Sequence, residues 1–139
     1  GKEVSEISRN YLRPTQENFH IAIMKGSIVV VRNLLRYQQI DPTANNNCSI
    51  RWASANGHTE IVRLLLQDPR VDPSAEDNEA IQDSSVNGHT EIVRILLQDP
   101  RVDPSARNNY SIQWASKNGH TEIVRLLLQD PRVSSTYRP

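Results

Sequence analysis

The sequence alternates polar stretches with short, dense apolar runs. The clearest run, residues 61–66, reads Ile-Val-Arg-Leu-Leu-Leu and has polar residues on both sides. In a helix these apolar side chains cover most of the circumference, so the helix should be buried on several sides. Asp68-Pro69 follows the run and should end the helix, because proline disfavours a helical conformation of the residue before it.

The same pattern recurs at a fixed interval. Residues 56–75 are repeated at 87–106 with one change, from Leu64 to Ile95, and residues 118–133 repeat the beginning of that stretch unaltered. Matching positions are 31 residues apart. A fixed period of this size is typical of stacked repeat proteins, in which each unit buries its apolar face against its neighbours.

A looser copy precedes the three regular ones, so we predict four units. It matches them at Phe19, Ala22, Arg32, Leu34, Leu35, Ile40, Asp41, Pro42 and Ala44. The repeat domain should span residues 14–139, with units at about 14–44, 45–75, 76–106 and 107–137. Residues 1–13 lie outside the register, and their apolar spacing predicts a short amphipathic helix that caps the first unit; a disordered leader is the alternative.

Each unit should contain two helices joined by a tight turn. In the second unit a first helix at about 49–55 would point Ile50, Ala53 and Ser54 inward. Asn56-Gly57 should end that helix, because glycine takes a left-handed conformation without strain. His58-Thr59 can then cap the second helix.

Composition limits the classes of function and the compartment. The chain has 16 basic and 16 acidic residues, which offers no general attraction to nucleic acid or to an anionic membrane. Nothing resembles a signal peptide or a spanning segment, so we expect a cytoplasmic or nuclear protein. Cys48 is the one cysteine, which excludes an intramolecular disulfide and fits a reducing compartment.

Catalytic and metal sites are not expected. His58, His89 and His120 hold the same place in successive units, and packed helices stand about 8–10 Å apart. Side chains that far apart cannot share a zinc ion at the roughly 2.0–2.1 Å of a Zn–N bond. Cys48 has no base at an activating spacing, and the few glycines form no phosphate-binding loop. We predict no enzyme activity, no metal and no cofactor.

Arginines also recur, at the positions of Arg63 and Arg94 on the second helices. Such a row could bind an acidic partner. Glutamates recur close by, at Glu60 and Glu91, so we favour a solvated row of weak ion pairs, each worth about 0–1 kcal/mol.

The unit resembles the ankyrin repeat over residues 17–133, through its Gly-His turn followed by Ile-Val and a Leu-Leu-Leu run. The family's Thr-Pro-Leu-His opening falls on Cys48-Ser49-Ile50-Arg51, where only the Leu-type position is kept, and the period is shorter than the family's usual length of about 33. The resemblance implies an all-α, ankyrin-type helical solenoid with short β-hairpin-like loops.

The copies differ mainly in the loop tips and first helices. The position of Trp52 holds Asp83 in the next unit and Trp114 in the one after, so it must be partly exposed. The resemblance implies that these helices line a concave surface that contacts partners. The candidate partner-binding residues are Ile21, Met24, Arg51, Trp52, Ala55, Glu79, Gln82, Asp83, Val86, Tyr110, Gln113, Trp114 and Lys117. Alternatively, each indole lies flat against the neighbouring helix and completes a local core.

These patterns favour a non-catalytic protein–protein interaction module whose rigid stack presents one surface to a partner protein. The alternative is a scaffold that self-associates through its C-terminal repeat. Residues 123–133 are an unmodified interior copy, and they leave a Leu-rich face open unless residues 134–139 fold over it with Tyr137. The near-identity of three units also fits an engineered, consensus-like repeat protein.

Overall fold

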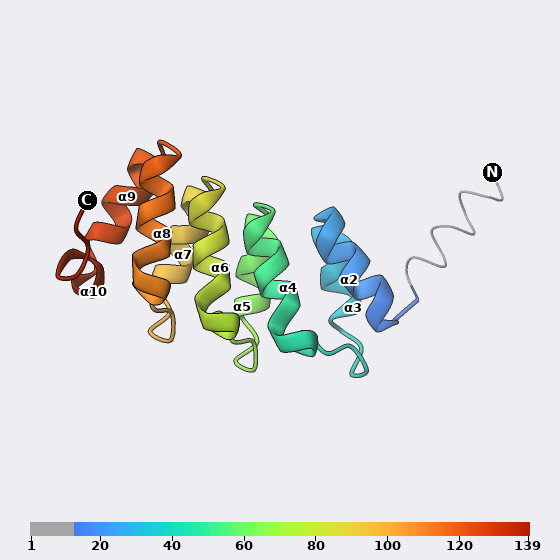
Figure 1. Cartoon of the computed structure of the whole chain (residues 1–139). Helices are drawn as coiled ribbons and strands as arrows, with labels where there is room; N and C mark the ends of the chain where they lie inside the picture. Colours follow the sequence, from blue (N-terminus) through green and yellow to red (C-terminus); the bar gives the residue numbers. More distant parts are fainter. Residues whose placement is uncertain (1–12) are drawn as a thin grey trace.

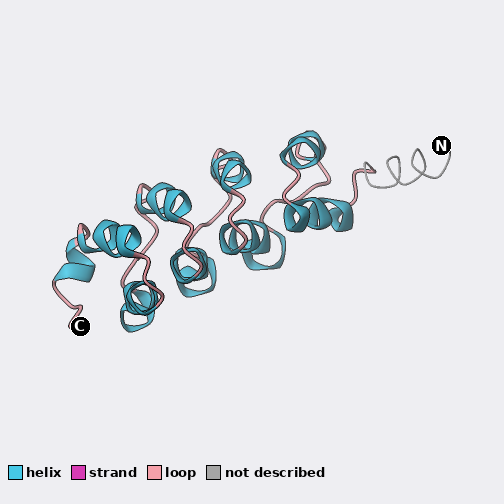
Figure 2. Ribbon diagram, turned by 90° about the horizontal axis from the view of Figure 1, so that it is seen from above, coloured by secondary structure: helices cyan, strands magenta, loops and turns pink. Residues whose placement is uncertain are grey.

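The computed structural model describes residues 13–139 as a stack of helix pairs (Figure 1). The helices are α2 (Gln16–Lys25), α3 (Ile28–Leu34), α4 (Ala44–Ala55), α5 (Thr59–Leu66), α6 (Ala75–Val86), α7 (Thr90–Leu97), α8 (Ala106–Lys117), α9 (Thr121–Leu128) and α10 (Pro131–Ser134). The first helices of the units form one row and the second helices another (Figure 2). The predicted capping segment, residues 1–13, lies outside the described residues except for Arg13.

Each of α4, α6 and α8 opens with a left-handed turn of three residues before the right-handed helix. Residues 45–47, 76–78 and 107–109 have φ between 54° and 66°. Asn and Asp, which tolerate this region best among residues with a side chain, fill most of these positions. The described residues contain no β-strand. The loops that we expected to be hairpin-like therefore reverse direction through a left-handed turn.

A side-chain amide from this turn binds the loop that leads to the next unit. Asn47 Oδ1 accepts the backbone N–H of Asp72 at 2.8 Å, and Asn78 Oδ1 accepts that of Asp103 at 2.8 Å. In the first unit Gln16 Oε1 plays the same part for Asp41 at 2.9 Å. The bond gives each loop a partner from the first helix of its own unit.

The histidines connect neighbouring units. His89 Nε2 donates to the carbonyl oxygen of Ala55 in the preceding unit at 3.0 Å, and His120 Nε2 donates to that of Val86 at 3.0 Å. His58 lies 3.3 Å from the carbonyl oxygen of Met24 in the same way. The prediction that this side chain caps its own helix is wrong, because none of the three makes a side-chain cap bond.

The core lies between the two rows of helices and continues from unit to unit. Ile50, Ala53 and Ser54 on α4 are fully buried, as predicted, and Ile61 and Leu65 on α5 are almost completely so. Full burial of an Ile, Val or Leu side chain contributes roughly 1.5–3 kcal/mol, so contacts between units hold the stack together.

The C-terminal end of the stack is partly covered. Val133 on α10 is fully buried, and Tyr137 packs against the core after the chain turns back. Leu127 is buried beneath them, whereas Leu128 remains 42% exposed. The structure therefore shows the arrangement in which the last residues fold back over the C-terminal face, and a small apolar area at Leu128 stays exposed.

Candidate functional site

The first-helix surface is the exposed side of α2, α4, α6 and α8. It carries an apolar cleft at one end, an acidic centre and an aromatic cluster at the other end. The candidate residues come together here because matching positions of successive units lie side by side on adjacent helices.

The apolar cleft lies between α2 and α4 and has a volume of about 490 Å³. Its lining consists of Glu17, His20, Ile21, Met24, Lys25 and Trp52. Met24 is 51% exposed, and the half-buried Trp52 meets the His20 ring edge-on, with 5.5 Å between centroids. Trp52 thus packs on the neighbouring unit and also lines open surface, which combines the two interpretations of the indoles.

The aromatic cluster lies on α8. Trp114 and Tyr110 are 38% and 37% exposed, and their ring centroids are 5.9 Å apart. Lys117 Nζ lies 4.7 Å from the Trp114 ring centroid, within range of a cation–π contact. Large aromatic side chains that stay accessible on a helix are typical anchors of protein interfaces.

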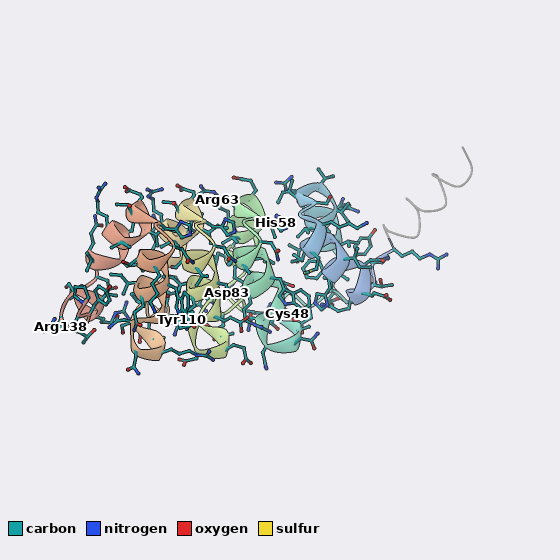
Figure 3. The ribbon with its side chains drawn as sticks, turned by 45° about the horizontal axis from the view of Figure 1, so that its top comes forward. Cys48, His58, Arg63, Asp83, Tyr110 and Arg138 are labelled. Carbon is teal, nitrogen blue, oxygen red and sulfur yellow. The ribbon has the colours of Figure 1, made fainter. Side chains whose placement is uncertain are left out.

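The acidic centre lies on α6, between the two aromatic regions. Figure 3 shows Asp83 in the middle of the stack, between Cys48 on α4 and Tyr110 on α8. Burial, together with the nearby Glu79 carboxyl, raises the pKa of Asp83 to about 6. Glu79 itself binds Arg51 of the preceding unit, at 3.3 Å.

Three candidate residues support the backbone more than they form surface. Arg51 donates to the carbonyl oxygens of Asn45 and Asn46, at 2.9 and 3.0 Å. At the same position of the next units, Gln82 donates to Asp77 O at 2.6 Å and Gln113 to Asn108 O at 2.5 Å. Gln82 is only 3% exposed, so it does not belong to the accessible surface.

Ala55 and Val86 are half-buried, and their carbonyl oxygens are bound by the next unit. Besides the histidine, Ala55 O accepts from Asn87 Nδ2 at 2.9 Å, and Val86 O accepts from Asn118 Nδ2 at 3.0 Å. These two residues therefore contribute mainly to the contact between neighbouring units.

Sequence reasoning missed one pair. Cys48 Sγ lies 3.5 Å from His20 Nε2, although 28 residues separate them, and the Gln16 amide nitrogen lies 3.1 Å from the same ring atom. Burial raises the pKa of the Cys48 thiol and lowers the pKa of His20, so both groups stay neutral. The signal available in the sequence was that His20 and Cys48 lie on the first helices of two neighbouring units. A buried, protonated thiol is a poor nucleophile.

The second-helix arginines Arg63 and Arg94 are ion-paired. Arg63 lies 3.5 Å from Glu60 and 3.2 Å from Glu91, and Arg94 also binds Glu91. The side chains are largely exposed, as expected for the solvated row of weak pairs. Figure 3 places Arg63 at the edge of the stack, away from Asp83.

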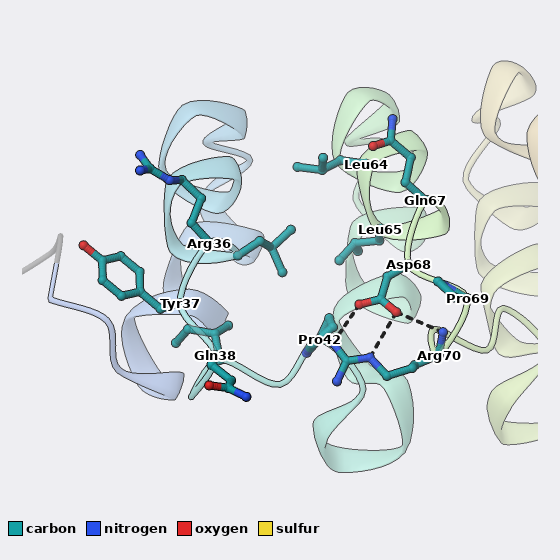
Figure 4. Close-up of a pocket in the computed structure, with 12 residues that line it drawn as sticks. Arg36, Tyr37, Gln38, Pro42, Leu64, Leu65, Gln67, Asp68, Pro69 and Arg70 are labelled. Carbon is teal, nitrogen blue, oxygen red and sulfur yellow. Dashed lines mark hydrogen bonds and ion pairs between the residues drawn. The ribbon is translucent and has the colours of Figure 1, made fainter.

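A second cleft opens at the same junction between the first two units, on the side of the second helices. Its volume is about 650 Å³. Leu64 and Leu65 of α5 point toward the first unit from one side of it, and Arg36 and Tyr37 belong to the other side, with their side chains turned away from α5 (Figure 4). The junction between the first two units is therefore hollowed from both sides.

Within residues 13–139, no group of three or more His, Cys, Asp or Glu side chains is arranged to hold a metal ion. The helices described here are also too short and too polar to span a membrane. A family model described as ankyrin repeats (3 copies) matches residues 8–77 and 71–136. A search of curated proteins finds no match.

Proposed function

Because the chain belongs to the ankyrin repeat family, whose members generally mediate protein–protein contacts, we propose that it is a non-catalytic module binding a partner protein on the first-helix surface. The observation that carries the proposal is the apolar cleft beside Met24 and Trp52, on the same surface as exposed Trp114. The lone, buried Cys48 is consistent with a cytoplasmic or nuclear setting for this role.

Rigidity supports the proposal. The side chains stand on helices that neighbouring units hold through histidine and asparagine bonds to backbone carbonyls. A surface fixed in this way loses little conformational entropy when a partner binds. Exposed Trp and Tyr side chains on such a surface are the residue types that most often dominate binding.

The test is capture of partners from a lysate of the source organism by three forms of the chain. These are the unaltered chain, a Met24→Ala, Trp114→Ala double variant, and Val29→Ala as a matched control. Val29 is 71% exposed on α3, in the row of second helices. Circular dichroism should first verify that both variants fold.

We expect a partner that the unaltered chain and Val29→Ala retain and the double variant loses. Equal capture by all three forms would move the binding site away from this surface. Mapping by cross-linking would then decide between the Arg63 row and the C-terminal end.

Self-association is a second candidate function, favoured by the exposed Leu128 at the C-terminal end. A scaffold of this kind should show a sedimentation coefficient that rises with concentration, and Leu128→Ala should reduce the rise. A constant monomer mass at high concentration would rule it out.

A further inference from the structure

Four carboxylates lie along α6 and the turn that opens it, and three of them bind a neighbouring unit. The pairs are Glu76 with Asn46 at 2.8 Å, Asp77 with Arg107 at 3.3 Å, and Glu79 with Arg51 at 3.3 Å. Among the described residues, Asp83 has no cation within ion-pair distance, and the nearby Glu79 carboxyl raises its pKa further. In the part of the chain that the structure describes, two arginines pair with two of the four carboxylates, so the centre of the first-helix surface holds more negative charge than its own cations balance.

The environment of Asp83 combines burial, which is the larger effect, with the charges around it. The charged groups that act on its carboxyl are Arg51 on α4, Glu79 on α6 and Arg107 on α8. Burial and Glu79 disfavour the carboxylate by more than the two arginines favour it, which raises the pKa of Asp83 to about 6. A third cation at this point would remove the repulsion between the two carboxyl groups.

We propose that the partner segment is basic, and that it places an arginine side chain against Asp83 and Glu79 while an apolar side chain fills the cleft at Trp52. This inference rests on the proposed function and adds the chemistry of the partner. Arginine fits better than lysine, because its planar guanidinium presents parallel donors to carboxylates and stacks on aromatic rings. Trp52 and Trp114 stand on the helices to either side of Asp83.

The spacing of the two anchors follows from the stack. Adjacent helices are about 8–10 Å apart, so Asp83 on α6 lies roughly 12–20 Å from the cleft between α2 and α4. An extended segment rises about 3.3 Å per residue. The arginine and the apolar residue should therefore be separated by about four to six positions in the partner sequence.

Binding should weaken in acid. Protonation of the free Asp83 carboxyl removes the charge that attracts the guanidinium, and the carboxyl is about nine-tenths protonated one pH unit below its pKa. The affinity should fall about tenfold between roughly pH 7.5 and pH 5. Asp83→Asn should bind weakly at both values.

The experiment is a selection from a random dodecapeptide phage library on the immobilised 139-residue chain at about pH 7.5. Enriched peptides are then synthesised and titrated by the fluorescence of the two tryptophans. The variants are Asp83→Asn and, as a matched control on the same element, Glu76→Gln, which leaves both arginines paired. Circular dichroism verifies the fold of both.

We expect enriched peptides to carry Arg and an apolar residue at the spacing given above. They should bind Asp83→Asn about tenfold more weakly and Glu76→Gln within about twofold of the unaltered chain. Enriched peptides that lack a basic residue, or that bind Asp83→Asn equally, would overturn this inference and leave the first-helix surface as the site. If no peptide is enriched, or if the Met24→Ala, Trp114→Ala double variant binds the peptides as tightly as the unaltered chain, both this inference and the proposed function fail.

Discussion

At the scale of single residues, the glycine between the two helices of each of the first three units is constrained twice, by its positive φ and by a histidine of the next unit. Gly57 has φ of +78°, and a Cβ at this position would lie 2.7 Å from the His89 ring of the next unit. Gly119 has nearly the same φ, +76°, but within the described residues nothing lies within 4 Å of its added Cβ. A comparison of the two glycines therefore separates the effect of backbone strain from the effect of contact between units.

We expect Gly57→Ala to lower the free energy of unfolding by about 2–4 kcal/mol and Gly119→Ala by about 1–2 kcal/mol. Both variants hold alanine in a left-handed conformation, and only the first also pushes an imidazole away from its carbonyl partner. Urea denaturation measures both values. Equal losses would show that the imidazole moves aside at no cost.

Asp83 gives a prediction about stability and pH. Its pKa is about 6 in the folded chain, against 3.8 for an ordinary aspartate. The folded state therefore binds the proton more tightly, so stability falls as the pH rises from about 4 to about 6. Asp83→Asn should be more stable than the unaltered chain by about 1 kcal/mol at pH 7, after allowance for partial exposure, and about equal near pH 3.8.

Thermal or urea unfolding across this pH range measures the difference. Glu76→Gln is the control, because the Glu76 carboxylate is exposed and binds the neutral side chain of Asn46. An Asp83→Asn variant whose advantage does not change with pH would show that the effect is not electrostatic.

The sequence could identify exposed positions only by comparison between units. That comparison correctly singled out Trp114, whose counterpart Asp83 could not belong to a core. It failed for Gln82, because a variable position can also be filled by side chains that each reach the same backbone carbonyl. The contact of His20 with Cys48 was missed because it joins side chains of two units, and the sequence does not give the position of one unit relative to the next.

At the scale of the elements, the left-handed turns replace the paired strands that the family resemblance implied. The helix positions could be predicted from the apolar periodicity and from glycine and proline, because these signals act locally in the sequence. The turns could not be predicted in this way, because their stability depends on a bond between Asn78 and the loop at Asp103, 25 residues along the chain. Asparagine serves both purposes, since it tolerates positive φ and supplies the acceptor.

Asn78→Ala should therefore lower the free energy of unfolding by about 2–3 kcal/mol, because it leaves the Asp103 N–H without its partner and strains the turn. Asn109→Ala, at the same position of the last unit, should lose about 1–2 kcal/mol, because its Oδ1 accepts no hydrogen bond and the variant loses only the bond that Asn109 Nδ2 donates to Thr136 Oγ1 at 2.9 Å. Asn78→Gly keeps the positive φ accessible and isolates the lost hydrogen bond. If both alanine variants lose the same stability in urea, the bond to Asp103 contributes no more than the bond to Thr136.

At the scale of the whole molecule, the fixed period determined the architecture, because every unit must bury its apolar face on the next one. The period could not predict how closely the units pack. The first unit has Tyr37-Gln38-Gln39 where the second has Asp68-Pro69-Arg70, and only the latter forms an Asp–Arg pair, at 2.8 Å. Both clefts lie at the junction between the first two units, which follows the Tyr37-Gln38-Gln39 loop.

The first unit should consequently open more easily than the interior of the stack. In a solenoid each unit is stabilised mainly by its neighbours, so a hollowed junction weakens the unit that depends on it. Amides of α3 should exchange with deuterium at least about tenfold faster than those of α7, which corresponds to about 1.4 kcal/mol. Mass spectrometry of exchanged peptides measures both helices in one experiment.

The cause can be tested by a variant that gives the first unit the loop of the second, Tyr37→Asp, Gln38→Pro, Gln39→Arg. If the missing Asp–Arg pair and proline loosen this junction, the variant should slow exchange in α3 toward that of α7 and leave α7 unchanged. Gln67→Ala, an exposed change on the far side of the 650 Å³ cleft, serves as the control. Uniform exchange along the unaltered chain would show instead that the stack opens as a single cooperative unit despite the two clefts.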